Sequence, residues 1–446
     1  IYNISKAVYQ DFEWGRDLAD LLFDKNKLDS DVLGAVIRGW YDLNLLTKQW
    51  EYILTILSSK EIIRNHFQYI TNLLQYGVKK EEGGIPAKLL LKADSVALKI
   101  WDLLHKVDDG QDNQADRDFS HLGGELAMFW IYALSRSRKE KDKDKTGIFQ
   151  PYRDRFETII NGDSEAAAQG LEMLASQLGF IYSIDQKWSR MNIIPLFNWD
   201  NDVHKARKVW EGWLGWGRLT EPLLDELIPF FKKSFHYIST ESPKERERLV
   251  EWIAGISLFW MDDPLNNGWI TDFLKTSNEQ DRKNFASQIG HNLMSMKIET
   301  KIDLWKRWLK RYWEERNQGI PVPLGDGELI RMVEWASELG CVFPDVVEII
   351  CSVPIPKPLN HMALFSRLEK KDTDITKKYP NELARLLIHL TGDTSMPRYF
   401  CGELEKLTEK IITSGVQMDL LHSLCDNLAA IGCERAAELS SYRIKL

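Results

Sequence analysis

The chain has 446 residues, and its 66 aspartates and glutamates outnumber its 58 lysines and arginines, which gives a formal net charge of −8. This length exceeds what a single hydrophobic core serves, so two or three domains or a stacked repeat array are expected, while 44% hydrophobic and 28% charged residues exclude a disordered or collagen-like chain. The acidic balance also argues against a protein that binds by broad neutralisation of nucleic-acid phosphates, although a local basic groove stays compatible with it.

The sequence shows neither a secretory signal nor a membrane-spanning segment. The first residues lack a basic segment followed by an apolar one, so no secretory signal is expected, and the start at Ile1 suggests a fragment. The longest apolar stretch, Leu249 to Met261, is shorter than the roughly 20 residues of a membrane-spanning helix. We therefore expect a cytoplasmic protein without a membrane segment.

The five cysteines are never spaced as CxxC, which predicts reduced thiols buried as small hydrophobes. They are Cys341, Cys351, Cys401, Cys425 and Cys433.

Apolar residues recur at intervals of three and four along almost the whole chain, which indicates amphipathic helices. Two stripes show the pattern: Leu224, Leu227, Ile228, Phe231, Phe235 and Ile238 in one, and Ile302, Trp305, Leu309, Tyr312 and Trp313 in the other. No convincing series of alternating residues suggests a sheet. The sequence therefore predicts an all-α fold.

Polar and proline-containing segments divide these helices into groups. Residues 108–118, 136–145 and 239–246 are rich in charged and turn-forming residues and are predicted as loops or solvated helix ends. Residues 318–327 and 353–360 contain prolines, which remove backbone donors and disfavour helix before them, so both are predicted as linkers. The predicted domains are an N-terminal helical block (1–118), a tryptophan-rich central block (119–318) and a C-terminal helical-repeat block (319–446).

The last block shows helix pairing most plainly. Glu403 to Thr413 forms one amphipathic helix, Gly415 can supply a left-handed stop, and Asp419 to Ile431 forms the next helix before Gly432. Short connections make such helices antiparallel neighbours, and successive pairs can bury their faces on one another. Since no repeat of fixed period is visible, we predict an irregular, HEAT-like α-solenoid.

Tryptophan is the most unusual feature of the composition. Of 17 tryptophans, 12 lie between Trp188 and Trp335. Their helical spacing favours packing between helices, while the alternative is a stacking platform or a protein-binding hot spot. Trp216 stands in the glycine-flanked string GWLGWG and is the tryptophan we expect to be exposed.

Basic residues decorate the helix that carries Trp305, and together with Trp216 they form the candidate interaction surface: Lys306, Arg307, Lys310 and Arg311. Basic and aromatic side chains together are typical of surfaces that bind single-stranded nucleic acid. However, Asp303, Glu314 and Glu315 are interleaved, as on any solvated helix face. Nucleic-acid binding is therefore not expected.

Four carboxylates allow an alternative, an α/α-toroid glycoside hydrolase. They follow Trp199 and Trp260 and are Asp200, Asp202, Asp262 and Asp263. Such an enzyme needs two carboxyl groups across a cleft with an aromatic floor, but the tryptophans here fall at helix-periodic sites. Nucleotide, zinc-protease, nucleophile-elbow and EF-hand motifs are absent, and the nine histidines are scattered. No catalytic, cofactor-binding or metal-binding residue is assigned.

Four segments in order resemble a known family. They begin at His121 (HLGGELAMFWIYALS), Ile194 (IPLFNW, followed by Trp210-Glu-Gly-Trp213), Leu304 (LWKRWLKRYW) and Gly340 (GCVFP). The stretch from about His121 to Leu446 thus resembles the helical C-terminal regions of bacterial defence-associated sirtuin proteins. The shared residues are His121, Gly123, Gly124, Trp130, Trp199, Trp210, Trp213, Phe343 and Pro344. Leu122 stands where that family commonly has proline.

The resemblance implies a function. In that family an N-terminal sirtuin-like domain hydrolyses NAD on phage infection, and the helical region senses a phage protein and holds an inactive oligomer together. This sequence lacks the glycine-rich strand–turn–helix that an NAD-binding domain needs, so it is similar to the regulatory part alone. The shared residues read as scaffold: we expect Gly123 and Gly124 to let a loop turn into a helix that places Trp130 on the core face.

The sequence therefore predicts a non-enzymatic helical scaffold, without a cofactor of its own, that recognises a phage protein and controls an attached effector domain in a homo-oligomer. The carbohydrate-active toroid and a generic helical adaptor remain the alternatives.

Overall fold

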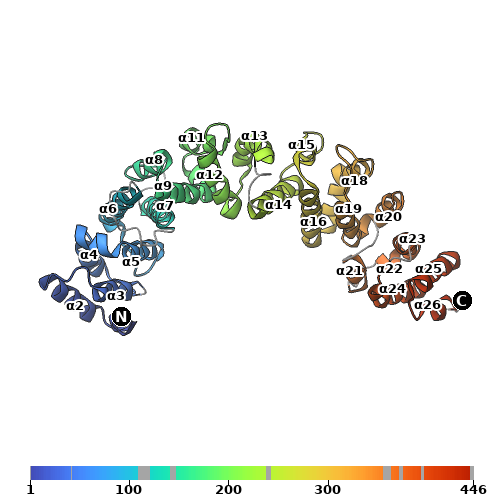
Figure 1. Ribbon diagram of the computed structural model, residues 1–446, viewed down its shortest axis with the longest axis horizontal. Coiled ribbons are helices and arrows are strands. Elements are labelled where there is room, and N and C mark those ends of the chain that lie inside the picture. The colour runs from blue at the N-terminus through green and yellow to red at the C-terminus, as the bar shows by residue number, and fades with distance from the viewer. Residues whose placement is uncertain are drawn as a thin grey trace. The chain divides into compact units, whose positions relative to one another are not determined.

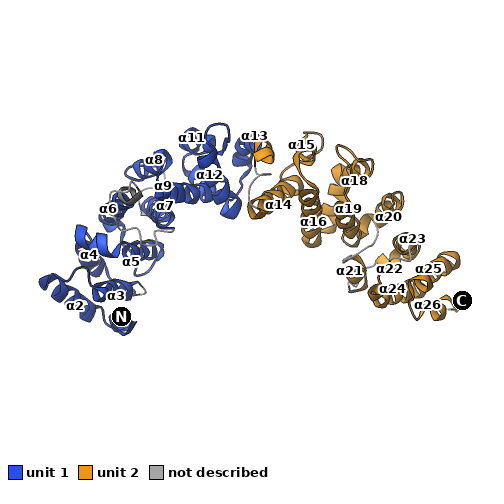
Figure 2. Cartoon of the chain, in the orientation of Figure 1, with its two compact units in different colours: residues 1–230 blue, residues 231–446 orange. Residues whose placement is uncertain are grey.

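The computed structural model describes residues 2–41, 43–108, 121–140, 147–237, 243–354, 363–370, 375–392 and 396–441. Across these ranges the regular elements are helices, with no strand, so the all-α prediction is confirmed (Figure 1). The chain forms two compact units, Ile1–Phe230 and Phe231–Leu446 (Figure 2). None of the described helices is both long enough and apolar enough to cross a membrane.

The first unit is a double row of helices. In one row α1, α3, α5, α7, α9 and α12 pack in succession, each on the next, while α2, α4, α6, α8 and α11 lie along the other side (Figure 1). Its elements are α1 (Tyr2–Gln10), α2 (Phe12–Asp24), α3 (Asp31–Trp40), α4 (Thr47–Ile56), α5 (Lys60–Lys79), η1 (Ala87–Leu89), α6 (Leu90–Asp108), α7 (Leu122–Glu140), α8 (Tyr152–Asn161), α9 (Glu165–Ser176), α10 (Leu178–Ile184), α11 (Gln186–Asn192), η2 (Ile194–Phe197), α12 (Val203–Trp216) and α13 (Glu221–Tyr237), which continues into the second unit. Stacked helix pairs of this kind are typical of an irregular solenoid.

The second unit repeats the two-row arrangement. Helix α14 packs on α16 and α16 on α19, while α18, α20, α23 and α25 follow one another in the second row. Its elements are α14 (Pro243–Phe259), α15 (Trp269–Thr276), α16 (Glu279–Ser295), α17 (Ile298–Leu304), the π-helical turn η4 (Trp305–Leu309), α18 (Lys310–Asn317), α19 (Asp326–Val333), η5 (Glu334–Ser337), η6 (Gly340–Val342), α20 (Phe343–Cys351), α21 (Leu364–Lys370), α22 (Ile375–Lys378), α23 (Pro380–Thr391), η7 (Arg398–Phe400), α24 (Cys401–Thr413), α25 (Met418–Ile431) and α26 (Ala436–Ser440).

The division into units differs from the three blocks drawn from the sequence, whose boundaries were residues 118 and 318. Helices α16 and α19 pack directly on each other across residue 318, because the linker there is short. That linker is non-helical up to Asp326, as predicted, and the Arg316 guanidinium holds it by donating to the carbonyls of Ile320 and Val322. The predicted loops at 109–118, 141–145, 239–242 and 355–360 lie outside the described residues.

Most tryptophans pack between helices, as the spacing predicts. The buried ones are Trp40, Trp50, Trp101, Trp130, Trp188, Trp199, Trp210, Trp213, Trp269, Trp305, Trp308, Trp313 and Trp335. Several indole N–H groups have internal partners: Trp130 donates to Asp94 Oδ1 at 2.9 Å, and Trp335 donates to the Ala286 carbonyl at 2.8 Å. Phe343 is buried as well, and Pro344 occupies the first turn of α20. These shared residues therefore build the scaffold.

The two glycines of the His121 segment have a different role from the one expected. Both lie inside the first turn of α7, and the left-handed residue before the helix is His121, with φ of 75°. A Cβ on Gly123 would overlap the Ala166 carbonyl oxygen of α9, whereas one on Gly124 would make an ordinary contact at 3.4 Å. The expectation of a loop turn is wrong because Gly123 serves close helix–helix packing instead.

The C-terminal helix pair is confirmed, but its cysteines are not all reduced. Gly415 and Gly432 take left-handed φ values of 87° and 93° after α24 and α25. Cys401 and Cys433 form a disulfide, with their Cα atoms 5.3 Å apart. The prediction of reduced thiols is wrong for this pair because the antiparallel hairpin returns the chain to the start of α24. The remaining cysteines are free: Cys425 is buried, and Cys341 and Cys351 are partly exposed.

Candidate functional site

The basic surface predicted around Trp305 is largely neutralised by carboxylates from neighbouring segments. The Arg311 Nη2 atom lies 2.6 Å from Asp263 Oδ1, and Arg307 Nε lies 2.7 Å from Asp303 Oδ2. Lys310 pairs with a further aspartate on α20, while Lys306 is exposed. With three of four cations in ion pairs, this helix does not present the continuous positive stripe that phosphate binding requires.

Three of the four carboxylates considered for glycoside hydrolysis serve as caps or ion-pair partners. Asp202 caps α12 by accepting hydrogen bonds from the N–H groups of His204 and Lys205, at 2.9 and 3.0 Å. Burial opposes ionisation of Asp263, but hydrogen bonds from the Asn266 N–H and the Arg311 guanidinium outweigh it and lower the pKa of this carboxyl.

A general acid requires the opposite shift, a raised pKa. Asp262 is fully exposed and pairs with Arg307, and Asp200 is exposed. Asp263 therefore lacks the environment of a catalytic acid, and the other three carboxylates of this set are exposed.

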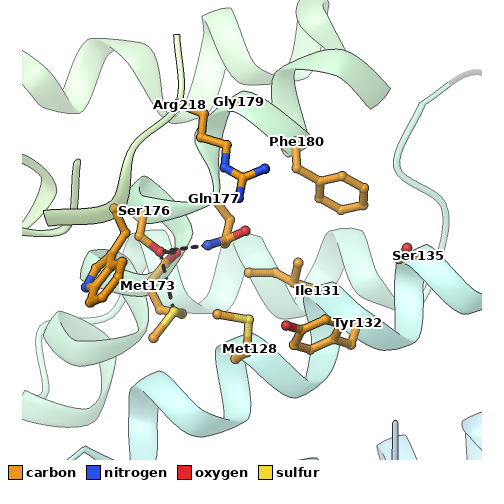
Figure 3. Close-up of a pocket in the computed structure, with 11 residues that line it drawn as sticks. Met128, Ile131, Tyr132, Ser135, Met173, Ser176, Gln177, Gly179, Phe180 and Arg218 are labelled. Atoms are coloured by element: carbon orange, nitrogen blue, oxygen red, sulfur yellow. Dashed lines mark hydrogen bonds between the residues drawn. The ribbon is translucent and has the colours of Figure 1, made fainter. Parts of the chain in front are cut away.

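A cavity of about 510 Å³ lies in the first unit, between α7, α9, α10 and the end of α12 (Figure 3). Its volume falls in the range of binding pockets. The residues that line it are Met128, Ile131, Tyr132, Ser135, Met173, Ser176, Gln177, Gly179, Phe180, Trp216 and Arg218. We call it the α7–α12 pocket.

Two helical faces form the floor of this pocket. Helix α7 contributes Met128, Ile131, Tyr132 and Ser135, whose spacing of three, four and seven residues places them on one face. The same spacing relates Met173, Ser176, Gln177 and Phe180, which follow one another from the end of α9 through Gln177 into α10. The pocket thus arises where two helices present equivalent faces to one another.

Three glycines position the wall of the α7–α12 pocket that Trp216 and Arg218 form. A Cβ on Gly212 would overlap the Glu172 carbonyl, so α12 packs closely on α9 only with glycine there. Gly217 ends α12, and a Cβ on it would lie 2.6 Å from the Trp213 ring. A Cβ on Gly179 would lie 2.7 Å from the Arg218 carbonyl oxygen. These close approaches bring Trp216 and Arg218 to the edge of the pocket.

The chemistry of the lining is mostly apolar with one charge. Ser176 donates to the Met173 carbonyl at 2.7 Å and accepts a hydrogen bond from Gln177 Nε2 at 3.3 Å, so its hydroxyl is already engaged. Arg218 is the one charged residue of the lining, and no described residue forms an ion pair with it. Figure 3 shows Arg218 across the cavity from Met128.

Trp216 lies at the mouth of the pocket with 77% of its surface exposed, which confirms the sequence prediction. On the α7 side Tyr132 is partly exposed, and Lys79 Nζ lies 5.4 Å above the centre of its ring. Tryptophan, tyrosine, arginine and methionine are the residues enriched at the centres of protein–protein interfaces. The pocket therefore has the composition of a protein-binding hot spot.

Other cavities of the described residues are less suited to this role. One in the first unit has a similar volume but polar walls, and its His66 is held by the Leu28 carbonyl at 2.8 Å. Another, of about 410 Å³, is lined by Lys205 among others, and that lysine pairs with Asp163 of the same lining. No group of three or more metal-ligating side chains occurs in the parts of the chain that were described.

Comparisons with known proteins bear on the second unit. Residues 232–428 match the model of a family described as a domain of unknown function (DUF4020). No curated protein and no solved structure matches the chain. The matched stretch is less than half of the chain and does not include the α7–α12 pocket.

Sequence reasoning identified Trp216 but missed Arg218 and the pocket. The available signal was the repeated spacing of the two lining faces, each combining methionine and aromatic residues with small polar ones. That signal does not show which two faces meet, because the meeting depends on the helix approaches at Gly123 and Gly212.

Proposed function

We propose that this chain is a helical recognition scaffold that binds a protein partner at the α7–α12 pocket. The observation that carries the proposal is the pocket itself, with the exposed Trp216 beside an apolar floor and an unpaired Arg218. Protein-binding hot spots typically combine large aromatic and arginine side chains around a concave apolar site. Stacked helix pairs add a long surface on either side for further contacts.

The resemblance to the helical regions of defence-associated sirtuin proteins supports a more specific role. In this proposal the partner is a phage protein, and its binding controls an attached NAD-hydrolysing domain in a cytoplasmic homo-oligomer. The chain itself contributes recognition and needs no cofactor. The caps and ion pairs that occupy Asp202, Asp262 and Asp263 are consistent with this division of labour.

The experiment joins the chain to a sirtuin-like NAD-hydrolysing domain and measures cellular NAD with and without phage infection. We expect NAD to fall only on infection, and Trp216→Ala to abolish the fall. Trp260→Ala is the matched control, because this tryptophan is 42% exposed in the second unit.

Equal NAD consumption with and without phage would contradict the sensor role. Partner binding that depends on Trp216 but leaves NAD unchanged would instead favour the generic adaptor. Release of reducing sugars that is lost in Asp262→Asn and Asp202→Asn variants would favour the glycoside hydrolase.

A further inference from the structure

The α7–α12 pocket is unlike the rest of the chain in its charge. The whole chain has a net charge of −8, but the lining of this pocket holds a single charged side chain, and that side chain is cationic. Arg218 is exposed and has no ion-pair partner among the described residues. An isolated guanidinium at the edge of an apolar cavity attracts a carboxylate, which it can bind through two parallel hydrogen bonds.

A second cation near the pocket is less available. Lys79 lies above the Tyr132 ring, and its positive charge also acts on Glu125, a half-buried carboxyl on α7. Arg218 is therefore the cation that remains free for a partner.

The opposite side of the pocket accepts an apolar group. Met128 and Ile131 come from α7 and Met173 from α9, and methionine side chains adapt readily to the shape of a bound group. Phe180 and Trp216 add flat aromatic walls. A leucine-, methionine- or phenylalanine-sized side chain matches this lining.

Resting on the function proposed above, we infer that the α7–α12 pocket recognises an acidic peptide segment of the partner. A large apolar side chain enters between α7 and α9, and a carboxylate one or two residues away binds Arg218. The apolar floor and the guanidinium lie on opposite sides of one cavity (Figure 3), so neighbouring residues of one segment can supply both groups. A mouth bounded by a 77% exposed tryptophan favours a continuous peptide over an enclosed small ligand.

The test selects peptides from a random display library on the full chain. The wild type is compared with Arg218→Glu, with Trp216→Ala and with Lys244→Glu, the last being a charge reversal at an exposed lysine of the second unit. We expect wild type and Lys244→Glu to enrich Asp or Glu beside Leu, Met or Phe. We expect Arg218→Glu to enrich Lys or Arg at the same position.

The selected peptide is then labelled and titrated into each variant by fluorescence anisotropy. Trp216→Ala should weaken binding about 30-fold, the loss typical of a hot-spot residue. Arg218→Gln should weaken it about three- to fivefold, because the ion pair is solvent-exposed, and added salt should reduce the difference. Unchanged thermal unfolding of both variants shows that folding is not the cause.

Two results would overturn the inference in distinguishable ways. If the peptides depend on Trp216 but are neutral, or if Arg218→Glu selects the same peptides as wild type, the acidic specificity is wrong while the proposed binding site stands. If selection gives no peptide whose binding depends on Trp216, the proposed site itself is wrong.

Discussion

Replacing Gly123 with alanine should destabilise the first unit, although alanine is the better helix former. A Cβ at this position overlaps the Ala166 carbonyl oxygen, which belongs to the backbone of α9 and cannot rotate away. Inserting a methyl group into a closed interface typically costs about 1 to 3 kcal/mol. The propensity gain of alanine over glycine offsets about 1 kcal/mol of this. Because the overlap is with rigid backbone, we take the upper end of this range, about 3 kcal/mol, and expect a net loss of about 2 kcal/mol.

The neighbouring glycine provides the control. Gly124 lies in the same turn of α7, but a Cβ there would make only an ordinary contact, 3.4 Å from the Gln169 carbonyl oxygen. Gly124→Ala should therefore leave stability unchanged or raise it slightly. The assay is urea unfolding of both variants, combined with hydrogen exchange of the α7 and α9 peptides to assign the change to the first unit. Equal free energies of unfolding for the two variants, or a Gly123→Ala protein more stable than wild type, would refute the packing argument.

Three further predictions concern the disulfide, a buried ion pair and the half-buried carboxyl of Glu125. Thiol titration of the denatured but unreduced protein should show three free thiols, and five thiols would contradict the disulfide. Cys401→Ser, which opens the loop to Cys433, should lower the free energy of unfolding in urea by about 3 to 4 kcal/mol. Arg316 and Glu328 are both fully buried, and Arg316 Nε lies 2.8 Å from Glu328 Oε1. Arg316→Met alone should therefore lower the free energy of unfolding by about 3 to 5 kcal/mol, and adding Glu328→Leu should recover much of that loss. Equal urea midpoints for the single and double variants would contradict the expected recovery. Burial raises the pKa of Glu125, so the folded state binds more protons and stability should fall as pH rises from the ordinary glutamate pKa through the raised one. Glu125→Gln should remove this fall in thermal unfolding between pH 4 and pH 8, and an unchanged pH profile would show that this carboxyl is not the cause.

The helical architecture was predictable because its signal is local. Each helix buries a stripe whose spacing is visible in the sequence, such as Leu224, Leu227, Phe231 and Phe235 on α13. The left-handed stops at Gly415 and Gly432 were predictable for the same reason, since only glycine adopts that conformation without strain. The exposure of Trp216 followed from the glycines on either side of it.

The candidate site was only partly predictable because it depends on helices that are distant in sequence. Asp262 and Asp263 neutralise Arg307 and Arg311 across more than 40 residues, so the basic surface seen in the sequence is not a basic surface in the fold. The partnership of Cys401 with Cys433 likewise depends on the return of the α24–α25 hairpin. Arg218 carried no distinguishing pattern at all, and its role comes from its place beside the pocket.

The claim that the α7–α12 pocket binds a partner is tested most directly by site-specific photocrosslinking in infected cells. Benzoylphenylalanine replaces Phe180 inside the pocket or, as the control, the exposed Trp260 in the second unit. We predict an adduct at position 180 whose peptide, identified by mass spectrometry, is phage-encoded and appears only after infection, with none at position 260. No phage-encoded adduct at position 180, or the same adducts at both positions, would contradict the account.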